Sequence, residues 1–500
     1  MSNTLQSSLP ISEAFDAEYL EYYLMLPLEV ADGELRVAVS GTPNEDALAD
    51  LAATYGAPVV TVDIEKEDLL DAIRRTFAAT ESVVELIRDV GSTVTDTADQ
   101  SDTVSDVRNL ANQPFVIRFV NLLIREAHES RASDIHLEST RAGLRVRLRI
   151  DGVLSELPAP PHTYQSAVVS RIKLLSELDI SERRIPQDGR VRVRLESREL
   201  DLRVSTTPTL FGESVVLRLL DRGGRPVTLD DLGMDAITHG RFRHLAERSH
   251  GIVLTTGPTG SGKTTTLYAA LSLRNPTEEK AITVEDPVEY HLAGVTQVPV
   301  HTKAGVTFAS ALRSILRQDP DVLMVGEMRD QETASIAVQA AMTGHLVFST
   351  LHTNDAVSAL MRLVDLGIEP YLIAATVEGI LAQRLVRRVC PECRTSYRPD
   401  SQTTALLARA PVSDNASRLE FVHGAGCVHC RNTGYSGRTG LFELLIMTDE
   451  LRDVLLASPR LSDLRRVAED QGMLPLRQNG WEMAKAGVTT IEEVLRVAGQ

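Results

Sequence analysis

GIVLTTGPTGSGKTTTLYAALSL, residues 251–273, joins an apolar segment to a helix-forming segment through a glycine-rich loop. The apolar residues 251–257 predict a buried strand, and residues 263–273 predict a helix. Between them, GPTGSGKT at 257–264 matches the pattern G-x-x-x-x-G-K-[ST] in the strand–loop–helix context that this pattern requires. The stretch therefore predicts a phosphate-binding loop on an α/β sheet. A chance match in a flexible glycine-rich loop is the alternative.

The chemistry of this loop indicates ATP bound with Mg²⁺. Its glycines allow backbone N–H groups to turn toward phosphate oxygens, and the following helix adds the positive end of its dipole. Lys263 is placed for the β- and γ-phosphates, and the Thr264 hydroxyl for Mg²⁺. The residues expected to hold the nucleotide are Gly257, Pro258, Thr259, Gly260, Ser261, Gly262, Lys263, Thr264 and Thr265.

A carboxylate that could activate water follows in RQDPDVLMVGEMRD, residues 317–330. Residues 322–325 predict a short buried strand, and Glu327 emerges at its end, where it could orient and deprotonate the attacking water. Gly326 occupies the position at which an acidic residue usually precedes this glutamate. We therefore expect Mg²⁺ to be held by Thr264, by water and by a carboxylate from elsewhere in the chain.

Two further segments place polar residues at the ends of expected strands. In ITVEDPVEY, residues 282–290, a strand over 282–284 delivers Glu285 and Asp286, which we expect to act in catalysis and in Mg²⁺ binding, respectively. In TGHLVFSTLHTND, residues 343–355, His345 and His352 flank an apolar strand and are predicted to sense the γ-phosphate. A solvated acidic loop and structural histidines are the alternatives.

All four cysteines of the chain lie in two pairs, Cys390-Pro-Glu-Cys393 and Cys427-Val-His-Cys430. Each pair can offer two thiolates to one tetrahedral ion, so together they predict a closed structural Zn²⁺ site. A redox pair or four unrelated thiols is the alternative, and His429 is an alternative ligand. Arginines flank the first pair and indicate a basic knob: Arg384, Arg387, Arg388 and Arg394.

Charge is concentrated at the beginning of the chain. Residues 1–110 hold 22 acidic and 6 basic side chains, a net charge of −16 out of −17 for all 500 residues. This segment indicates a docking module for a basic partner surface, or simply a solvated acidic domain. The nearly neutral remainder disfavours a broad nucleic-acid surface. No apolar run reaches the roughly 18 residues of a membrane span and no signal peptide is recognisable, so we expect a cytoplasmic protein with peripheral membrane contact.

Local patterns predict several domains, as the length of the chain also does. The expected parts are a small α/β domain at 1–90, a flexible acidic linker at 91–112, a middle domain at 113–225, a connector at 226–235, and an α/β domain at 236–500 in which strands alternate with helices. In the middle domain, the hairpin pattern at 144–157 places Leu144, Val146, Leu148 and Ile150 on one face. The opposite face, together with residues 191–205, presents a row of arginines or a merely solvated face: Arg145, Arg147, Arg149, Arg192, Arg194 and Arg203.

Taken in order, GPTGSGKTTTLYA, ITVEDPVEY, DVLMVGEMRDQETA and TGHLVFSTLHTNDA resemble the secretion-superfamily ATPases. The chain looks like the traffic ATPases of type II secretion (the general secretion pathway protein E family) and is also similar to type IV pilus assembly ATPases. The resemblance extends over 113–500 through SDIHLE, RIPQDGR and FGESVVLRLLDR, and is loose over the first 110 residues.

This resemblance implies a hexameric ring of multidomain α/β chains. Each would have a RecA-like P-loop ATPase core, a PAS-like α/β middle domain, a small N-terminal α/β domain and a tetracysteine zinc insertion at about 388–435. It also implies that Arg203 in LDLRVS and Arg218 in VVLRLLD approach the γ-phosphate from the middle domain.

The function expected on these grounds is ATP hydrolysis that powers pseudopilus assembly for type II secretion at the cytoplasmic face of the inner membrane. The implied partners are the cytoplasmic domain of an inner-membrane platform protein, reached through residues 1–90, and a polytopic platform protein. The alternatives are a type IV pilus extension ATPase, a DNA-translocating ring, and a scaffold that binds ATP without turnover. Glu327, Lys263 and the two arginines argue against the scaffold, and nothing in the sequence indicates a nucleic-acid partner.

Overall fold

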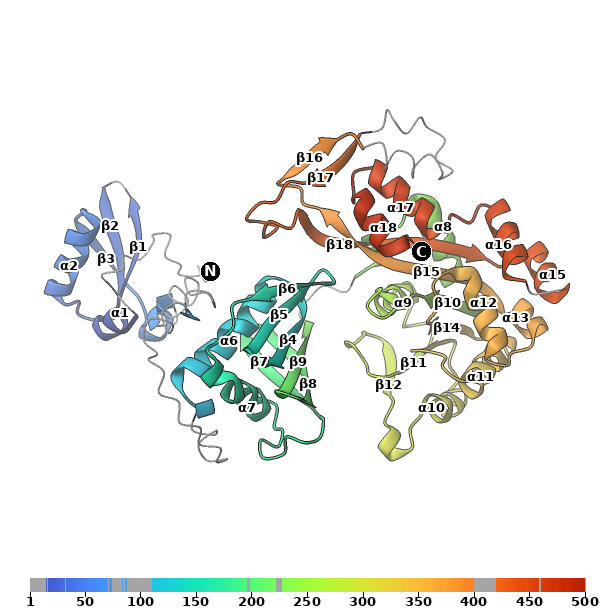
Figure 1. The fold of residues 1–500 in the computed structure, drawn as a ribbon, viewed down its shortest axis with the longest axis horizontal. Coiled ribbons are helices and arrows are strands. Elements are labelled where there is room, and N and C mark those ends of the chain that lie inside the picture. Colours follow the sequence, from blue (N-terminus) through green and yellow to red (C-terminus); the bar gives the residue numbers. More distant parts are fainter. Residues whose placement is uncertain are drawn as a thin grey trace. The chain divides into compact units, whose positions relative to one another are not determined.

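The computed structural model describes residues 15, 17–31, 33–70, 72, 73, 83, 86, 87, 110–195, 198–221, 227–399, 420–457 and 460–499. The chain divides into two compact units. The first consists mainly of residues up to 219, and the second mainly of residues from 220 onward. The first unit contains a three-stranded and a six-stranded sheet, and the second is built on a seven-stranded sheet (Figure 1). Most of the expected linker at 91–112 lies outside the described residues.

The three-stranded sheet consists of an antiparallel hairpin, predicted by an Asp-Gly turn, and one parallel strand. Its elements are α1 (Ala17–Tyr23), β1 (Met25–Ala31), β2 (Glu34–Val39), α2 (Glu45–Tyr55) and β3 (Val59–Asp63). The predicted helix α2 begins at Asn44, whose side chain accepts a hydrogen bond from the Ala47 N–H, and ends at Gly56. Gly56 has φ of 64°, a left-handed conformation that glycine adopts without strain. After β3, residues 66–70, 72 and 73 are helical.

The six-stranded sheet has the order β6-β5-β4-β9-β8-β7. Its module contains α6 (Pro114–Glu129), β4 (Ala132–Thr140), β5 (Gly143–Ile150), β6 (Val153–Leu157), η1 (His162–Tyr164), α7 (Gln165–Leu175), β7 (Gln187–Leu195), β8 (Arg198–Thr209) and β9 (Gly212–Asp221). α6 packs an apolar face that includes Phe119 and Leu123 into this module. The helical spacing of apolar residues in its sequence predicts this face.

The alternation predicted for β5 is confirmed. Leu144, Val146 and Leu148 are buried, whereas the arginines between them lie toward solvent. Carboxylates on the neighbouring strands offset these arginines: Arg145 pairs with Glu156 at 2.8 Å, Arg147 with Glu138, and Arg149 with Asp134 at 3.7 Å. Three of the six arginines of the predicted row are therefore paired with carboxylates within their own sheet.

The seven-stranded sheet of the second unit has the order β12-β11-β13-β14-β10-β15-β18. The strands from β12 to β15 run parallel, and β18 is antiparallel to β15. The strands are β10 (Gly251–Thr256), β11 (Ala281–Glu285), β12 (Val295–Pro299), β13 (Val322–Val325), β14 (Leu346–Leu351), β15 (Val377–Val389) and β18 (Tyr435–Ile446). The predicted α/β class is confirmed by this doubly covered parallel sheet.

Helices cover both faces of this sheet. Successive side chains of a strand point to opposite faces, and because the inner strands are largely apolar, both faces must be buried. Val253 packs in one core with Phe242 and Leu267, whereas Ile252 and Leu254 belong to the core on the other face. The helices are η2 (Leu229–Leu232), α8 (Ala236–Ala246), α9 (Lys263–Leu271), η3 (Thr302–Ala304), α10 (Phe308–Ile315), α11 (Gln331–Met342), α12 (Ala356–Asp365), α13 (Pro370–Thr376), α15 (Asp449–Ala457), α16 (Leu461–Asp470), α17 (Leu476–Lys485) and α18 (Ile491–Ala498).

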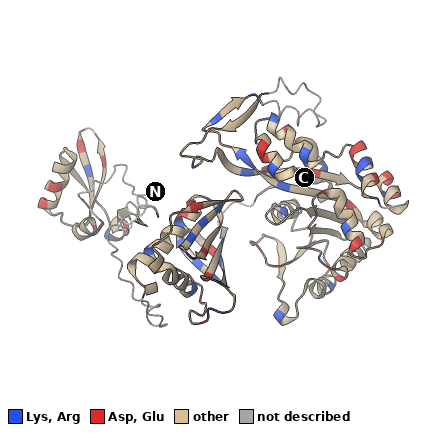
Figure 2. Cartoon of the chain, in the orientation of Figure 1, with Lys and Arg blue, Asp and Glu red and all other residues tan. Residues whose placement is uncertain are grey.

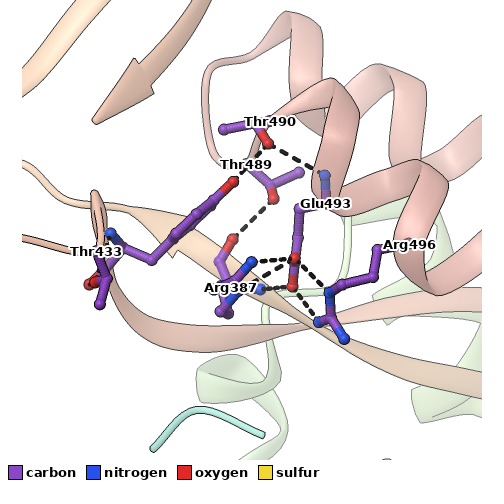
Figure 3. Close-up of polar contacts among 7 residues, drawn as sticks. Arg387, Thr433, Thr489, Thr490, Glu493 and Arg496 are labelled. Atoms are coloured by element: carbon purple, nitrogen blue, oxygen red, sulfur yellow. Dashed lines mark hydrogen bonds and ion pairs between the residues drawn. The ribbon is translucent and has the colours of Figure 1, made fainter. Parts of the chain in front are cut away.

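A buried carboxylate fastens the last helix, α18, to strand β15 (Figure 3). Glu493 accepts hydrogen bonds from the backbone N–H and the guanidinium of Arg387, and from the guanidinium of Arg496. The Arg387 guanidinium also stacks 3.9 Å from the centre of the Tyr435 ring. Although burial opposes it, these hydrogen bonds from Arg496 and Arg387 lower the pKa of Glu493 to about 2. Arg387 is thus engaged in this ion pair with Glu493 and is not part of the expected basic knob beside the cysteines.

Charged residues are unevenly spread over the described elements (Figure 2). Acidic residues gather on α2, which carries Glu45, Asp46 and Asp50 and ends without a basic residue in its last turn. Within the described part of the chain, every helix is too short or too polar to cross a bilayer.

Candidate nucleotide site and cysteine cluster

The phosphate loop follows β10 and leads directly into α9. β10 is fully buried, so the loop is anchored on a rigid strand. Gly262 forms the N-cap of α9 with φ of 86°, a left-handed conformation. The Lys263 ammonium donates to the carbonyl oxygens of Gly257 at 2.8 Å and Pro258 at 3.1 Å, so it lies folded over the loop. Thr264 and Thr265 are half-buried in the first turn of α9.

Parallel strands bring several predicted residues to the same edge of the sheet as this loop. Thr256 at the end of β10 is level with Leu351 of β14, and Val284 of β11 is level with Val325 of β13. The residues that follow these strands therefore share one edge, where open α/β sheets bind ligands. They are Asp286 after β11, Glu327 after β13 and His352 after β14.

Glu327 is the central carboxylate of this edge. Its side chain is mostly buried, and its oxygens contact Arg329 Nη2 at 2.6 Å and His352 Nε2 at 3.3 Å. The hydrogen bond with Glu327 raises the pKa of Arg329, so the Arg329 guanidinium stays charged beside this carboxyl group. Sequence reasoning missed Arg329, although it lies only two residues after Glu327 in an exposed stretch. The arrangement can hold a water molecule near the Glu327 carboxyl group beside the phosphate loop.

The structure corrects the role expected for His345. This residue precedes β14, whose first residue, Leu346, is level with Gly251 at the beginning of β10. His345 thus lies at the opposite edge of the sheet from the phosphate loop, about six strand residues or roughly 20 Å away. Its Nδ1 lies 2.9 Å from the Ala340 carbonyl oxygen and closes the end of α11. The prediction that His345 senses the γ-phosphate is therefore wrong for the nucleotide site of its own chain.

Glu285 also differs from its expected catalytic role. Its side chain is 2% exposed and accepts hydrogen bonds from Tyr268, Thr283 and Gln297. Burial, and then the bond to Glu285, raises the pKa of the Tyr268 hydroxyl, so this phenol remains a donor. The carboxylate is committed to fastening α9 to β11, and the structure does not support direct action on a nucleotide.

Thr264 and Asp286 remain the residues predicted to bind Mg²⁺. Both lie at the loop edge of the sheet, and Asp286 is exposed. Hydroxyl and carboxylate oxygens are the donors that this cation prefers, and it commonly keeps several water ligands. Mg²⁺ bound there would neutralise phosphate charge.

Arg203 and Arg218 lie in the first unit, on β8 and β9, and line a cavity of about 450 Å³ there. Arg190, which sequence reasoning missed, lines the same cavity. The Arg218 Nε donates to Asp134 at 3.0 Å, and its side chain remains largely exposed. The apolar pattern around Arg218 therefore reflects the buried face of β9, while the guanidinium itself points outward. Asp188 lines the cavity as well, so basic residues outnumber acidic ones there.

The four cysteines converge on one point in the second unit. Their sulfur atoms all lie within 4.8 Å of one another, and three Sγ pairs are 3.7–3.9 Å apart. A tetrahedral ion with metal–sulfur bonds of about 2.3 Å requires sulfurs roughly 3.8 Å apart, so the cluster fits Zn²⁺. Backbone N–H groups of Gly426, Cys427 and Gly434 point at sulfur atoms from 3.2–3.3 Å and would support thiolates. The cluster joins the region of β16 (Arg394–Tyr397) and β17 (Phe421–Gly424) to the β15–β18 ribbon.

The cysteine cluster is expected to bind one Zn²⁺ per chain. Metal analysis of the purified full chain by mass spectrometry should show a ratio near one, and the double substitution Cys393→Ser, Cys430→Ser should abolish it. His429→Ala is the control, because His429 is exposed and lies 3.4 Å from the Ser436 hydroxyl. Loss of zinc in this control variant would instead make His429 a ligand.

Nucleotide affinity is expected to fall as pH rises above about 8. Burial lowers the pKa of Lys263 to about 8, with Arg384 adding to the effect and Glu327 opposing it. Bound phosphates favour the ammonium form, so binding above this pH must take up a proton. The affinity for ADP should fall by up to about tenfold per pH unit there, since phosphate groups titrate well below this range.

Titration calorimetry in buffers of different ionisation enthalpy would measure this proton uptake. Lys263→Arg is the matched control, because a guanidinium stays charged over the whole range. The variant should bind ADP without the dependence above pH 8. An equal dependence in the variant would show that another group titrates.

Comparisons with known proteins show the family to which the chain belongs. The model of the family described as "Type II/IV secretion system protein" matches residues 109–496, and that of the "MshEN domain" matches residues 3–83. The type II secretion system protein E of Xanthomonas campestris is 42% identical over 99% of this chain and 87% of its own, and that of Pseudomonas aeruginosa 47% over 85% and 86%. The type IV pilus assembly ATPase PilB of Myxococcus xanthus is 42% identical over 96% of this chain and 85% of its own.

Among solved structures, the pilus retraction motor PilT, determined with bound ADP, is 28% identical with a TM-score of 0.53. The similarity covers 76% of this chain and 96% of that one. A family match over most of the chain and the close relatives point to the same conclusion as the phosphate loop. The chain belongs to the Type II/IV secretion system protein family and is an ATPase of that family.

Proposed function

We propose that the chain is a hexameric motor on the cytoplasmic face of the inner membrane that powers pseudopilus assembly for type II protein secretion. The observation that carries the motor chemistry is the shared edge at which the phosphate loop, Glu327 and His352 meet. The secretion role is supported by the relatives named type II secretion system protein E, one of which is 47% identical over 85% of this chain, against 42% over 96% for the pilus relative. The number of chains in the ring, six, is inferred from the resemblance of the sequence motifs to this family.

In this proposal each site residue has a defined task in hydrolysis. Glu327 orients a water molecule and accepts its proton as the water oxygen attacks the γ-phosphorus. The bond from the γ-phosphorus to the bridging oxygen breaks, and ADP leaves. Lys263 offsets the charge of the phosphates. His352, which contacts Glu327, is proposed to sense the γ-phosphate. Mg²⁺, held by Thr264 and Asp286, would supply further charge neutralisation.

Arg203 and Arg218 are proposed to act at the γ-phosphate, as the resemblance to the secretion-superfamily ATPases implies. Both residues line one cavity of the first unit, and a guanidinium offers planar donors suited to phosphate oxygens. Such a group near the γ-phosphate stabilises charge that develops in the transition state.

Residues 1–90 are proposed as the dock for the cytoplasmic domain of an inner-membrane platform protein. Support comes from the acidic residues of α2 and from the net charge of −16 over residues 1–110. A basic partner surface would be attracted to such a module at physiological salt. Type IV pilus extension is the second candidate function, because the pilus assembly relative is similar over nearly the whole chain.

Inactivating the gene in the native host separates the two functions. The proposed role predicts that exported enzymes disappear from the culture medium while surface pili remain. Wild-type protein should restore export, whereas a chain lacking residues 1–90 should bind ATP normally but leave the membrane fraction. Loss of pili with normal export would overturn the secretion role, and a truncated chain that stays on membranes would overturn the docking role.

A further inference from the structure

Strand β15 continues past the point where β10 ends and forms a wall along the phosphate loop. Thr256, the last residue of β10, is level with Ala382 of β15. Gln383, the next residue of β15, therefore lies beside Gly257, the first residue of the loop. The Gln383 side chain is only 2% exposed, and its Nε2 donates to the Ser261 carbonyl oxygen at 2.6 Å. A buried amide thus reaches from a core strand to the middle of the loop.

The loop approaches Gln383 so closely that a side chain is excluded at Gly257 and crowded at Gly262. A Cβ atom on Gly257 would lie 2.5 Å from the Gln383 carbonyl oxygen, and one on Gly262 would lie 3.1 Å from the Gln383 Nε2. Both glycines also have positive φ, 150° and 86°, respectively. Glycine at 257 is therefore favoured by the approach to Gln383 as well as by backbone conformation, and glycine at 262 mainly by backbone conformation.

The hydrogen bond from Gln383 determines which way one peptide group of the loop faces. In a trans peptide, the carbonyl of Ser261 and the N–H of Gly262 point in opposite directions. When the carbonyl is held against Gln383, the N–H is turned away from β15. That N–H is one of the donors by which a loop of this pattern binds phosphate oxygens.

We propose that Gln383 is a positioning residue that keeps the Ser261–Gly262 peptide oriented for phosphate binding. This inference rests on the proposed role of the loop in binding ATP. A purely structural role is the competing explanation, because a buried carbonyl requires a donor in any case. Under that explanation, removing the donor would lower stability but leave the nucleotide affinity of the folded chain unchanged.

Gln383→Met removes the donor and keeps the length of the side chain. The affinity of the full chain for ADP with a fluorescent ribose substituent should fall about 10- to 100-fold, the equivalent of one hydrogen bond to a charged group. KM for ATP should rise by a similar factor, with a smaller change in kcat. Leu381→Met is the matched control, since Leu381 is a buried residue of the same strand whose side chain packs in the α8–α9 core. It should bind within twofold of wild type.

Gln383→Glu adds a readout that a structural role would not produce. The introduced carboxylate repels the Ser261 carbonyl when ionised, but its protonated form has an O–H that can donate to the same oxygen. Burial favours the protonated form. Affinity relative to wild type at the same pH should therefore improve severalfold as pH is lowered from 8 to 6, whereas Gln383→Met should show no such recovery.

Lys263→Ala separates failure of this inference from failure of the nucleotide site. If Lys263→Ala loses binding while Gln383→Met binds within twofold of wild type, the positioning role is overturned and the site stands. If Lys263→Ala binds normally, both are overturned. Weaker binding by Gln383→Met and partial recovery of Gln383→Glu at low pH would together support the proposal, whereas lower stability with unchanged nucleotide affinity would overturn it.

Discussion

Glu327→Gln is expected to lower kcat for ATP hydrolysis about 100- to 10,000-fold while leaving ATP affinity within a few fold of wild type. The amide keeps the size of the side chain and can still contact His352, but it cannot accept a proton from water. Lys263 and the loop backbone, which hold the phosphates, are unchanged. The substitution should therefore slow the hydrolysis step and leave ATP binding unchanged. Single-turnover hydrolysis with saturating enzyme measures the rate of this step directly.

Glu332→Gln provides the matched control for this substitution. Glu332 lies in the first turn of α11, five residues after Glu327, and forms an exposed ion pair with Arg313 at 2.5 Å. Exposed pairs of this kind contribute about 0–1 kcal/mol, so the control should hydrolyse ATP normally. Turnover by Glu327→Gln at the wild-type rate would mean that another group activates the water.

Glu493→Gln is expected to destabilise the C-terminal helices by about 3–5 kcal/mol at neutral pH. The side chain of Glu493 is fully buried and is the shared partner of Arg387 and Arg496, as Figure 3 shows. Neutralising it leaves the half-buried Arg387 guanidinium without a countercharge. α18 should then detach from β15. Trp481, the single tryptophan of the chain, packs with Ile491 and Val494 of α18, so its fluorescence in urea reports this unfolding.

The stabilisation by Glu493 is expected to disappear in acid. The folded pKa of Glu493, about 2, lies below its ordinary value of 4.5, so the unfolded chain binds the proton more tightly. The stability from Glu493 is fully present above about pH 5 and is lost as pH falls toward 2. The difference between wild type and Glu493→Gln in the urea midpoint should shrink over this window. Glu492→Gln, an exposed neighbour, should match wild type throughout, and a difference independent of pH would contradict the assigned ion pair.

Much of the nucleotide site was predictable because its residues belong to short continuous motifs. A loop, the strand before it and the helix after it form one local unit, and the ends of parallel strands meet at one edge. Glu327, His352 and Asp286 could be placed on that basis. The same reasoning failed for His345 and Glu285, because it identifies which strand a residue adjoins but not which end or which direction its side chain takes. His345 adjoins the correct strand at its wrong end.

Residues that act through contacts distant in sequence could not be predicted in this way. Gln383 lies 122 residues from Ser261, and Arg387 lies 106 residues from Glu493. In the sequence, Arg387 is only one of several basic residues near Cys390, and Gln383 is only one of several polar residues in β15. Their partners depend on β15 pairing with β10 and β18, which is a property of sheet order.

The sequence by itself determined the α/β class, the phosphate loop and the cysteine pairs, because each depends on residue types at short, regular spacing. The apolar strand before Gly257 and the two C-x-x-C pairs carry their geometry within a few residues. Only the tertiary structure decided that four sulfurs converge, that Glu285 fastens a helix, and that Gln383 supports the phosphate loop. These outcomes depend on the order and register of strands, which arise when the two faces of the sheet are buried together.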